Sequence, residues 1–461
     1  MVNCFEMSCC ATKPLYFQLE MNELDGIKIR RKRLKRIRSP MQDRISNLPW
    51  NTLDCILCHL PIRDAVRTSL LSKSWRYKWV TLSKLVFNYR SGNLEVDSLG
   101  EYELVNLVHR VLLAHCGQID EFKLSTYNSI SSSDVDHWIS YLTKNDIRRL
   151  SLTCGFDPKM YELPPCIFSC RQITHLCINN CLLKPPLEFK GFNSLVSLNL
   201  ESFSIDTIEL ERLIRSCPVL ERLVLTNIIS VPLFKVYGPN LKYLCLEGNF
   251  GDIHLENCSL LTNISFQMTS DGLESHQELE EGSAYRLIQA LGCLCCLRRL
   301  TLSCVFLKYL ALSKGPEKLH VYKHLKALEL SMNSYDLDEV VVAVSLLSGS
   351  SSLQELYIAA CNDVHVTHRP INFLDKLQAN CYFNALRVVE IILHGYNSEQ
   401  NSIPCWRLEL EVIKFLLSRS PILEKMIIQM FGQGIQLHRL FMGELLEFER
   451  ASPRVVITFF P

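Results

Sequence analysis

A short leucine motif recurs along most of this chain and constrains its fold more than any other feature. It has the form apolar-x-x-apolar-x-apolar, and its starts run from residue 119 to residue 423 in eleven steps, a mean interval of about 28 residues. Leucine supplies 75 of the 461 residues, so loose matches arise by chance. The strict form Leu-x-x-Leu-x-Leu is a better test, because it occurs six times where the leucine content predicts about two. The series starts at Ile119, Ile147, Ile173, Leu195, Leu220, Leu241, Leu261, Leu297, Leu325, Leu353, Leu386 and Leu423.

The period and the motif together indicate leucine-rich repeats, whose units run about 20–29 residues. In each unit a short strand points its leucines inward, and the residues between them face an open side. One unit cannot cover its own apolar face, so neighbouring units must stack. We therefore expect an α/β fold in which a leucine-rich-repeat solenoid spans residues 105–380 and continues through residues 381–455.

The segments between these strands read as helices. In the range 208–217 the residues Leu210, Leu213 and Ile214 fall on one helical face, and a proline follows. The range 411–420 repeats this design, again ahead of a proline. Proline cannot continue a helix, so each helix should end at a turn that leads into the next strand.

Residues 41–90 have a different, compact helical pattern. Leu48-Pro49 opens the first expected helix, because proline suits a first helical turn, and Pro61 ends it. An apolar stripe follows at three- to four-residue spacing within this helix and in the next. Trp75 and Trp79 mark a third short helix. The two stripes consist of Leu53, Ile56, Leu57 and Leu60, and of Val66, Leu70 and Leu71.

Residues 1–40 form a basic leader for which we expect disorder. The leader carries 9 basic and 4 acidic residues, whereas the remainder of the chain carries 40 and 44. A dense basic run can serve as a nuclear-import signal. A solvated tail without function, or translation that begins at Met41, would explain the run equally simply. The candidate import residues are Arg30, Arg31, Lys32, Arg33, Lys35 and Arg36.

Three blocks of this sequence, in order, resemble the plant F-box/FBD/LRR-repeat family. The segment 43–79 resembles an F-box through Leu48-Pro49, Ile56-Leu57-x-x-Leu60-Pro61 and Leu71-Ser72-x-x-Trp75-Arg76. The segment 410–428 resembles the core of an FBD domain, and 444–453 its closing part. The resemblance therefore divides the chain into a leader at 1–40, an F-box at 41–90, leucine-rich repeats at 105–380 and an FBD domain at 381–455. One departure is Trp50-Asn51, where F-boxes usually carry acidic residues.

The resemblance implies a substrate-recognition subunit of an SCF-type ubiquitin ligase that performs no chemistry itself. Its F-box would dock on a Skp-type linker protein, and through it on a cullin, while the repeats hold a target protein. Residues 41–90 carry 8 basic and 3 acidic groups, which would either speed docking on an acidic linker or form a solvated face. By position, the linker would contact Leu48, Pro49, Ile56, Leu57, Leu60, Pro61, Val66, Leu70 and Trp75.

The target is expected on the open side of the strands, at the positions between the leucines. Arginine and aromatic residues there are common interface anchors. Charges of both signs occur among these positions, which argues against a nucleic-acid ligand, because that would need a basic stripe. The candidate target-binding residues are Arg149, His175, Arg222, Tyr243, Arg299 and Tyr357.

Rival functions have weaker support in the sequence. We find no Gly-rich phosphate loop, no His-Glu-x-x-His and no Gly-x-Ser-x-Gly, so we expect neither catalysis nor a cofactor. The pairs Cys55/Cys58 and His365/His368 lack further ligands at a zinc-site spacing, and Cys293-Leu-Cys-Cys296 is more simply read as small packing residues, so no metal is expected. A repeat scaffold that binds the linker without ubiquitin transfer, and a small molecule joining repeats to target, remain alternatives.

The remaining composition points to a folded protein of the nucleus and/or cytoplasm. Hydrophobic residues make up 48% and charged residues 21% of the chain, which excludes a mostly disordered protein. No apolar run approaches the roughly 20 residues that span a bilayer, so no membrane partner is expected. The 21 cysteines follow no secretion signal, so we expect them to be reduced and buried.

Overall fold

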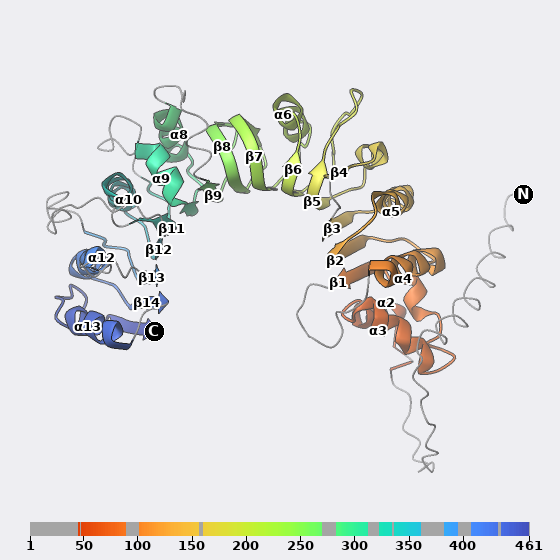
Figure 1. Cartoon of the computed structure of the whole chain (residues 1–461), viewed down its shortest axis with the longest axis horizontal. Helices are drawn as coiled ribbons and strands as arrows, with labels where there is room; N and C mark the ends of the chain where they lie inside the picture. The colour runs from red at the N-terminus through yellow and green to blue at the C-terminus, as the bar shows by residue number, and fades with distance from the viewer. Residues whose placement is uncertain are drawn as a thin grey trace, which may run out of the picture. The chain divides into compact units, whose positions relative to one another are not determined.

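The structure is a computed structural model whose chain divides into two compact units, Met1–Leu195 and Val196–Pro461. The described residues are 45–46, 48–88, 101–155, 160–269, 283–311, 322–333, 336–360, 382–394, 407–431 and 435–460. Together they show short helices followed by a long series of strand–helix repeats, which confirms the expected α/β solenoid behind an F-box (Figure 1).

The first unit begins with two short α-helices, α2 (Trp50–Leu57) and α3 (Ile62–Arg67). Pro49 and Pro61 occupy the N-cap positions, as expected for a residue without an N–H. The prediction of a third α-helix around Trp75 and Trp79 is wrong. After α3 the chain forms turns and two 3₁₀ segments, η1 (Thr68–Leu70) and η2 (Lys78–Thr81). Trp75 lies in a turn and Trp79 in η2, and both indoles are buried.

A strand that the repeat analysis missed joins these helices to the repeats. β1 (Lys84–Asn88) pairs in parallel with β2 (Glu121–Ser129), and Leu82, Leu85 and Phe87 are buried at the motif spacing. The helix α4 (Glu101–Ala114) lies between these strands in the sequence. Its end is fixed to the F-box because the buried His115 ring contacts the Leu82 carbonyl at 2.9 Å and the Cys116 N–H donates to Val80 at 2.7 Å. The F-box thus continues directly into the first repeat.

The remainder of the first unit repeats the strand–helix design. β2 pairs with β3 (Arg149–Gly155), and β3 pairs with β5 (His175–Leu182), all in parallel. The helix α5 (Ser132–Lys144) connects β2 to β3 and buries Trp138. A short strand, β4 (Tyr161–Glu162), and the 3₁₀ segment η3 (Pro165–Ser169) precede β5. In this unit α4 and α5 lie along the same side of β1–β3 (Figure 1).

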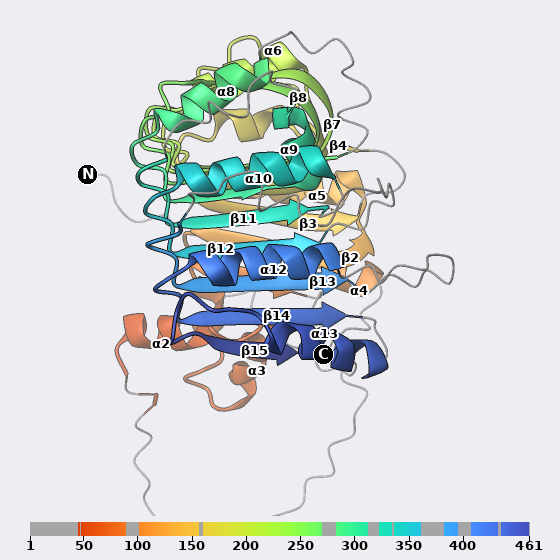
Figure 2. The same ribbon diagram turned by 90° about the vertical axis from the view of Figure 1, so that its left-hand side faces the viewer.

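The second unit is a longer parallel sheet in which every strand pairs with the next in sequence. Its strands are β6 (Ser197–Ser204), β7 (Arg222–Tyr237), β8 (Tyr243–Glu256), β9 (Asn263–Met268), β10 (Arg299–Leu302), β11 (Ala327–Met332), β12 (Glu355–Ala360), β13 (Val388–His394), β14 (Lys425–Phe431) and β15 (Val456–Phe460). Its helices are α6 (Thr207–Arg215), α8 (Ser283–Gly292), α9 (Cys304–Ala311), α10 (Leu337–Gly349), α12 (Arg407–Arg419) and α13 (Ile435–Leu446). Figure 2 shows β11–β15 side by side with α10 and α12 against them.

The register of these strands follows the leucine motif. Each of the twelve predicted repeat strands begins two residues after its motif start, as β6 does after Leu195 and β14 after Leu423. The motif residues are buried, with 0% of Leu195, Leu198 and Leu200 exposed. The helices predicted over 208–217 and 411–420 are α6 and α12. Stacked leucines therefore form one continuous core in each unit, and the residues between them form what we call the open face.

A buried carboxylate lies where α9 meets α10. The Glu339 side chain is 0% exposed and accepts the Asn333 N–H at 2.7 Å, while the Lys308 ammonium lies 3.4 Å away. Burial raises the pKa of Glu339 to about 8, although the Asn333 N–H and Lys308 oppose the shift. A carboxyl group in this environment is therefore held largely in its neutral form near neutral pH.

We predict that Glu339 makes the protein less stable as pH rises. The folded pKa of about 8 exceeds an unfolded value of about 4.3, so the unfolded state releases the proton first. Stability should fall between these values by up to about 1.4 kcal/mol per pH unit. Urea unfolding from pH 5 to pH 8 should show a shallower decline for Glu339→Gln. The exposed neighbour Asp338→Asn serves as the control, and an unchanged slope in Glu339→Gln would contradict the assignment.

Candidate functional site

The F-box exposes several of the apolar residues that the sequence predicts as linker contacts. Ile56 is 44% exposed, Leu60 37% and Leu70 67%, and Pro49 and Pro61 are also exposed. Leu48 is half-buried beside them. These six of the nine predicted linker-contact residues are accessible, and we call them the F-box face.

The other three predicted contacts are corrected by the structure. Leu57 is 1% exposed, and Val66 and Trp75 are each 7% exposed. Trp75 is also fixed from within, because its indole N–H donates to the Ser46 hydroxyl at 2.6 Å. These side chains fill the small core and hold the F-box face in place rather than presenting themselves to a partner.

Three further apolar residues of the F-box are exposed although they were not among the predicted linker contacts. Leu71 was assigned to a helical apolar stripe, yet it is 70% exposed because α3 ends at Arg67 and the chain then turns. Tyr77 is 41% exposed for a similar reason. Trp50, noted as a departure from the F-box pattern, is 40% exposed next to Pro49 and enlarges the accessible apolar area.

The F-box surface is also basic. Between residues 48 and 88 the sequence has six lysines and arginines and two aspartates. Of the basic groups, Arg67 forms an exposed ion pair with Asp64 at 3.4 Å, and Lys78 lies 4.9 Å from the Trp75 ring centroid. Such a field favours an acidic partner.

On the open face of the first unit, neighbouring strands pair opposite charges. Lys84, Glu121, Arg149 and His175 occupy equivalent positions on four adjacent strands. Glu121 lies 3.4 Å from Lys84 and 3.5 Å from Arg149. Burial and the Arg149 guanidinium lower the pKa of His175, and Glu121 opposes them. The predicted target residues Arg149 and His175 are thus neighbours on a row in which Glu121 is shared between two cations.

On the open face of the second unit, Arg222 and Tyr243 are stacked. The Arg222 guanidinium lies 3.7 Å from the Tyr243 ring centroid, because the two residues are register partners on β7 and β8. The ring quadrupole attracts the guanidinium in this arrangement. The sequence alone does not show that these two residues are neighbours. The strand register places them side by side.

Farther along this open face, polar and charged residues interact across neighbouring strands from β10 to β13. Arg299 on β10 is ion-paired with Glu329 on β11 at 2.5 Å and with Glu355 on β12 at 3.3 Å. Thr301 donates to the other Glu329 oxygen at 2.9 Å. Burial, followed by the carboxylates of Glu390 and Glu329, raises the pKa of Tyr357. The predicted residues Arg299 and Tyr357 are therefore linked through carboxylates.

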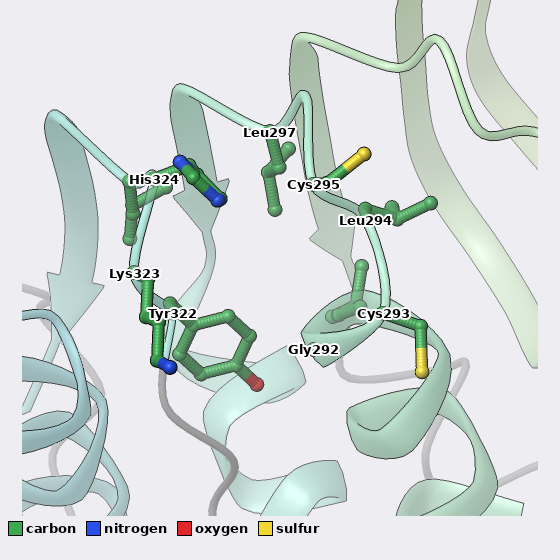
Figure 3. A pocket seen from close by; sticks show the side chains of 10 residues that line it. Gly292, Cys293, Leu294, Cys295, Leu297, Tyr322, Lys323 and His324 are labelled. Atoms are coloured by element: carbon green, nitrogen blue, oxygen red, sulfur yellow. The ribbon is translucent and has the colours of Figure 1, made fainter.

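The second unit also contains a small cavity. It has a volume of about 270 Å³ and is formed by the turns at 291–297 and 322–325, which precede β10 and β11 (Figure 3). Tyr322 forms part of its wall, and burial raises the pKa of this residue. Cys293 and Cys295, which we expected to be packing residues, are exposed here.

The remaining predictions concern metal ligands, the nuclear-import residues and membrane-spanning segments. Among the residues that the structure describes, no group of three His, Cys, Asp or Glu side chains could hold a metal ion. Cys55 is exposed and Cys58 half-buried, both on or next to α2. His365, His368 and the six candidate import residues lie outside the described residues, so nuclear import stays a prediction. Within the described part of the chain, no helix is both long and apolar enough to cross a membrane.

Comparisons with known proteins match both parts of the chain. The F-box domain model matches residues 45–87, and the model for the leucine-rich repeats of FBD-associated F-box protein At5g56370 matches residues 135–358. F-box/FBD/LRR-repeat protein At1g13570 of Arabidopsis thaliana is 36% identical, over 90% of this chain and 98% of its own length. A second Arabidopsis thaliana protein, F-box/FBD/LRR-repeat protein At1g51370, is 25% identical over 90% and 95%.

A solved structure was also matched. The leucine-rich repeat-containing protein LegL7 from Legionella pneumophila is 14% identical, with 78% of this chain and 89% of that chain covered. The TM-score is 0.27, so the assignment of the repeats rests on the sequence motif and on the strand register described above.

The division between F-box core and F-box face predicts two different stability effects. Leu57→Ala should destabilise the F-box by about 2–5 kcal/mol, because it leaves a cavity in a small core. Leu70→Ala should change its stability by less than about 0.5 kcal/mol, because the side chain is already in water. Hydrogen exchange of amides in α2 and α3 would measure both. Equal effects for the two variants would refute this division.

Proposed function

The chain belongs to the plant F-box/FBD/LRR-repeat family, and we propose that it is the substrate-recognition adaptor of an SCF-type ubiquitin ligase. In this proposal the F-box face binds a Skp-type linker protein, which joins it to a cullin. The open face of the repeats binds a target protein. The chain itself performs no chemistry and acts by placing the target near a charged ubiquitin-conjugating enzyme, which raises effective concentration.

The observation that carries this proposal is the exposed F-box face on an otherwise well-packed unit. Pro49, Ile56, Leu60, Pro61 and Leu70 are accessible although their neighbours Leu53 and Leu57 are buried. Exposed apolar residues accompanied by charged ones are typical of protein-binding surfaces. The basic residues around this face add long-range attraction for an acidic linker.

The attachment of the F-box to β1 supports a role in positioning. β1 pairs with β2 over five register partners, and the His115 and Cys116 contacts fix α4 to the same segment. A rigid connection fixes the direction in which the first repeats leave the linker-binding face. Such fixed placement is what an adaptor contributes to transfer of ubiquitin.

We predict that Leu70→Asp weakens linker binding at least tenfold. A carboxylate buried in an apolar interface without a partner costs more than the lost leucine contact. Binding of the purified full chain to a Skp-type linker would be measured by isothermal titration. Leu113→Asp, at an exposed leucine of α4 with 73% exposure, is the matched control and should bind normally. Unchanged binding by Leu70→Asp, with circular dichroism showing a folded protein, would reject this docking face.

A scaffold that binds the linker without ubiquitin transfer is distinguished by reconstitution. We expect the full chain, assembled with linker, cullin, RING subunit and conjugating enzyme, to acquire ubiquitin on its own lysines, because effective concentration in the complex is high. The Leu70→Asp variant should lose this modification. Assembly of the complete complex without any ubiquitin on the chain would favour the scaffold.

A further inference from the structure

The polar network on the open face of β10–β14 leaves some carboxylates more fully neutralised than others. Glu329 has a partner at each carboxylate oxygen, Arg299 at one and Thr301 at the other. Glu355 shares the same guanidinium at the longer distance of 3.3 Å. Glu390 receives the neutral amide of Gln429 at 3.0 Å. Negative charge is therefore concentrated toward β12 and β13, at Glu355 and Glu390.

The parallel register places an aromatic ring beside these two carboxylates. Tyr357 is the direct register partner of Glu390, and it lies two residues after Glu355 on the same side of β12. Adjacent strands are about 4.8 Å apart, so the three side chains surround one small area. Two carboxylates with an aromatic wall are suited to an ammonium or guanidinium group.

Aliphatic side chains occupy the adjoining register positions on β13 and β14. Val388 and Ile392 flank Glu390 on β13, and Ile427 is the register partner of Glu390 on β14. All three are only partly buried although they are aliphatic, and they face the same side as Glu390 because strand side chains alternate. The area thus combines an acidic part, formed by Glu355 and Glu390, with an aliphatic surface next to it.

We propose that this area binds a target segment in which one lysine or arginine adjoins aliphatic residues. The basic side chain lies between Glu355 and Glu390 against the Tyr357 ring, and the aliphatic side chains cover Val388, Ile392 and Ile427. This inference rests on the proposed function, since it names the class of target that the open face receives. Charge complementarity and the fixed register of the strands carry it.

Cations at the edge of this area limit the partner to one basic residue there. Lys425 is the register partner of Val388 on β14 and is exposed. Arg387 precedes Val388 and is ion-paired with Glu424 at 3.3 Å. A second basic residue on this side of the partner would meet Lys425. A polybasic segment is therefore a poorer fit than a single basic residue with aliphatic neighbours.

The test is selection of a displayed library of random ten-residue peptides on the immobilised full chain. We expect enriched peptides to carry one lysine or arginine within two positions of Val, Leu or Ile. Synthetic copies should bind less tightly by about tenfold when that basic residue becomes glutamine. Glu390→Gln, which keeps the acceptor for Gln429, should reduce affinity similarly. Glu424→Gln, a rim carboxylate outside the area, should not.

Three outcomes would overturn the proposal. They are the absence of enriched peptides, enrichment of acidic, uncharged or polybasic sequences, and affinity of the selected peptide that does not change in Glu390→Gln. Tyr357→Leu supplies a second variant, which should weaken binding of the basic peptide while the aliphatic contacts remain. Circular dichroism would establish that each variant is folded.

The same samples separate this inference from the function on which it rests. Binding of the Skp-type linker depends on the F-box face and should be unaffected by Glu390→Gln. Normal linker binding with failed peptide selection rejects the target class and leaves the adaptor role intact. Peptide binding without linker binding rejects the adaptor role alone.

Discussion

The structure depends on burial of leucine side chains between neighbouring repeats, because no repeat can cover its own apolar strand. Leu198, Leu223 and Leu244, on three successive strands, are each 0% exposed, and each is covered by its register neighbours. Burial of this kind contributes roughly 1.5–3 kcal/mol per leucine, so the sheet persists only as a stack. Even the F-box joins it, since Leu85 and Phe87 of β1 pack as motif residues do.

The same stacking determines the electrostatics of the open face. Parallel pairing places residues at the same motif position on neighbouring strands side by side, at the distance between strands. Opposite charges then neutralise one another, as at Lys84, Glu121 and Arg149, and a stacked pair forms at Arg222 and Tyr243. The charge that a partner meets is the remainder of the side-chain charge after these internal pairings. On β12 and β13 that remainder includes Glu390, whose hydrogen-bonding partner is a neutral amide.

Much of the repeat architecture could be predicted from the sequence, because one period of leucines determines both strand position and inward direction. All twelve motif starts led to strands, and the range 208–217 led to α6. The motif at Leu82, Leu85 and Phe87 was present as well, but it lies inside the range 41–90 assigned to the F-box domain, and the predicted repeats begin only at Ile119. Which side chains touch was beyond sequence, because Arg299 and Glu355 are 56 residues apart and meet only through the register. In the F-box, helical periodicity placed Val66 correctly on a buried face but misplaced Leu70 and Leu71, since α3 ends at Arg67 and the 3₁₀ turn that follows does not maintain the same period.

The two ends of the strand series are unlike, and this difference bears on how such chains change in length over evolution. At the start, β1 is continuous with the F-box and has α3 packed against it. At the end, β15 carries Val456 and Phe460 at 62% and 52% exposure. Because each repeat contacts mainly its neighbours, duplication or loss of a unit near β15 alters the number of repeats without changing the register at β1. A gene lineage can thereby vary the recognition surface while it inherits the docking module unaltered.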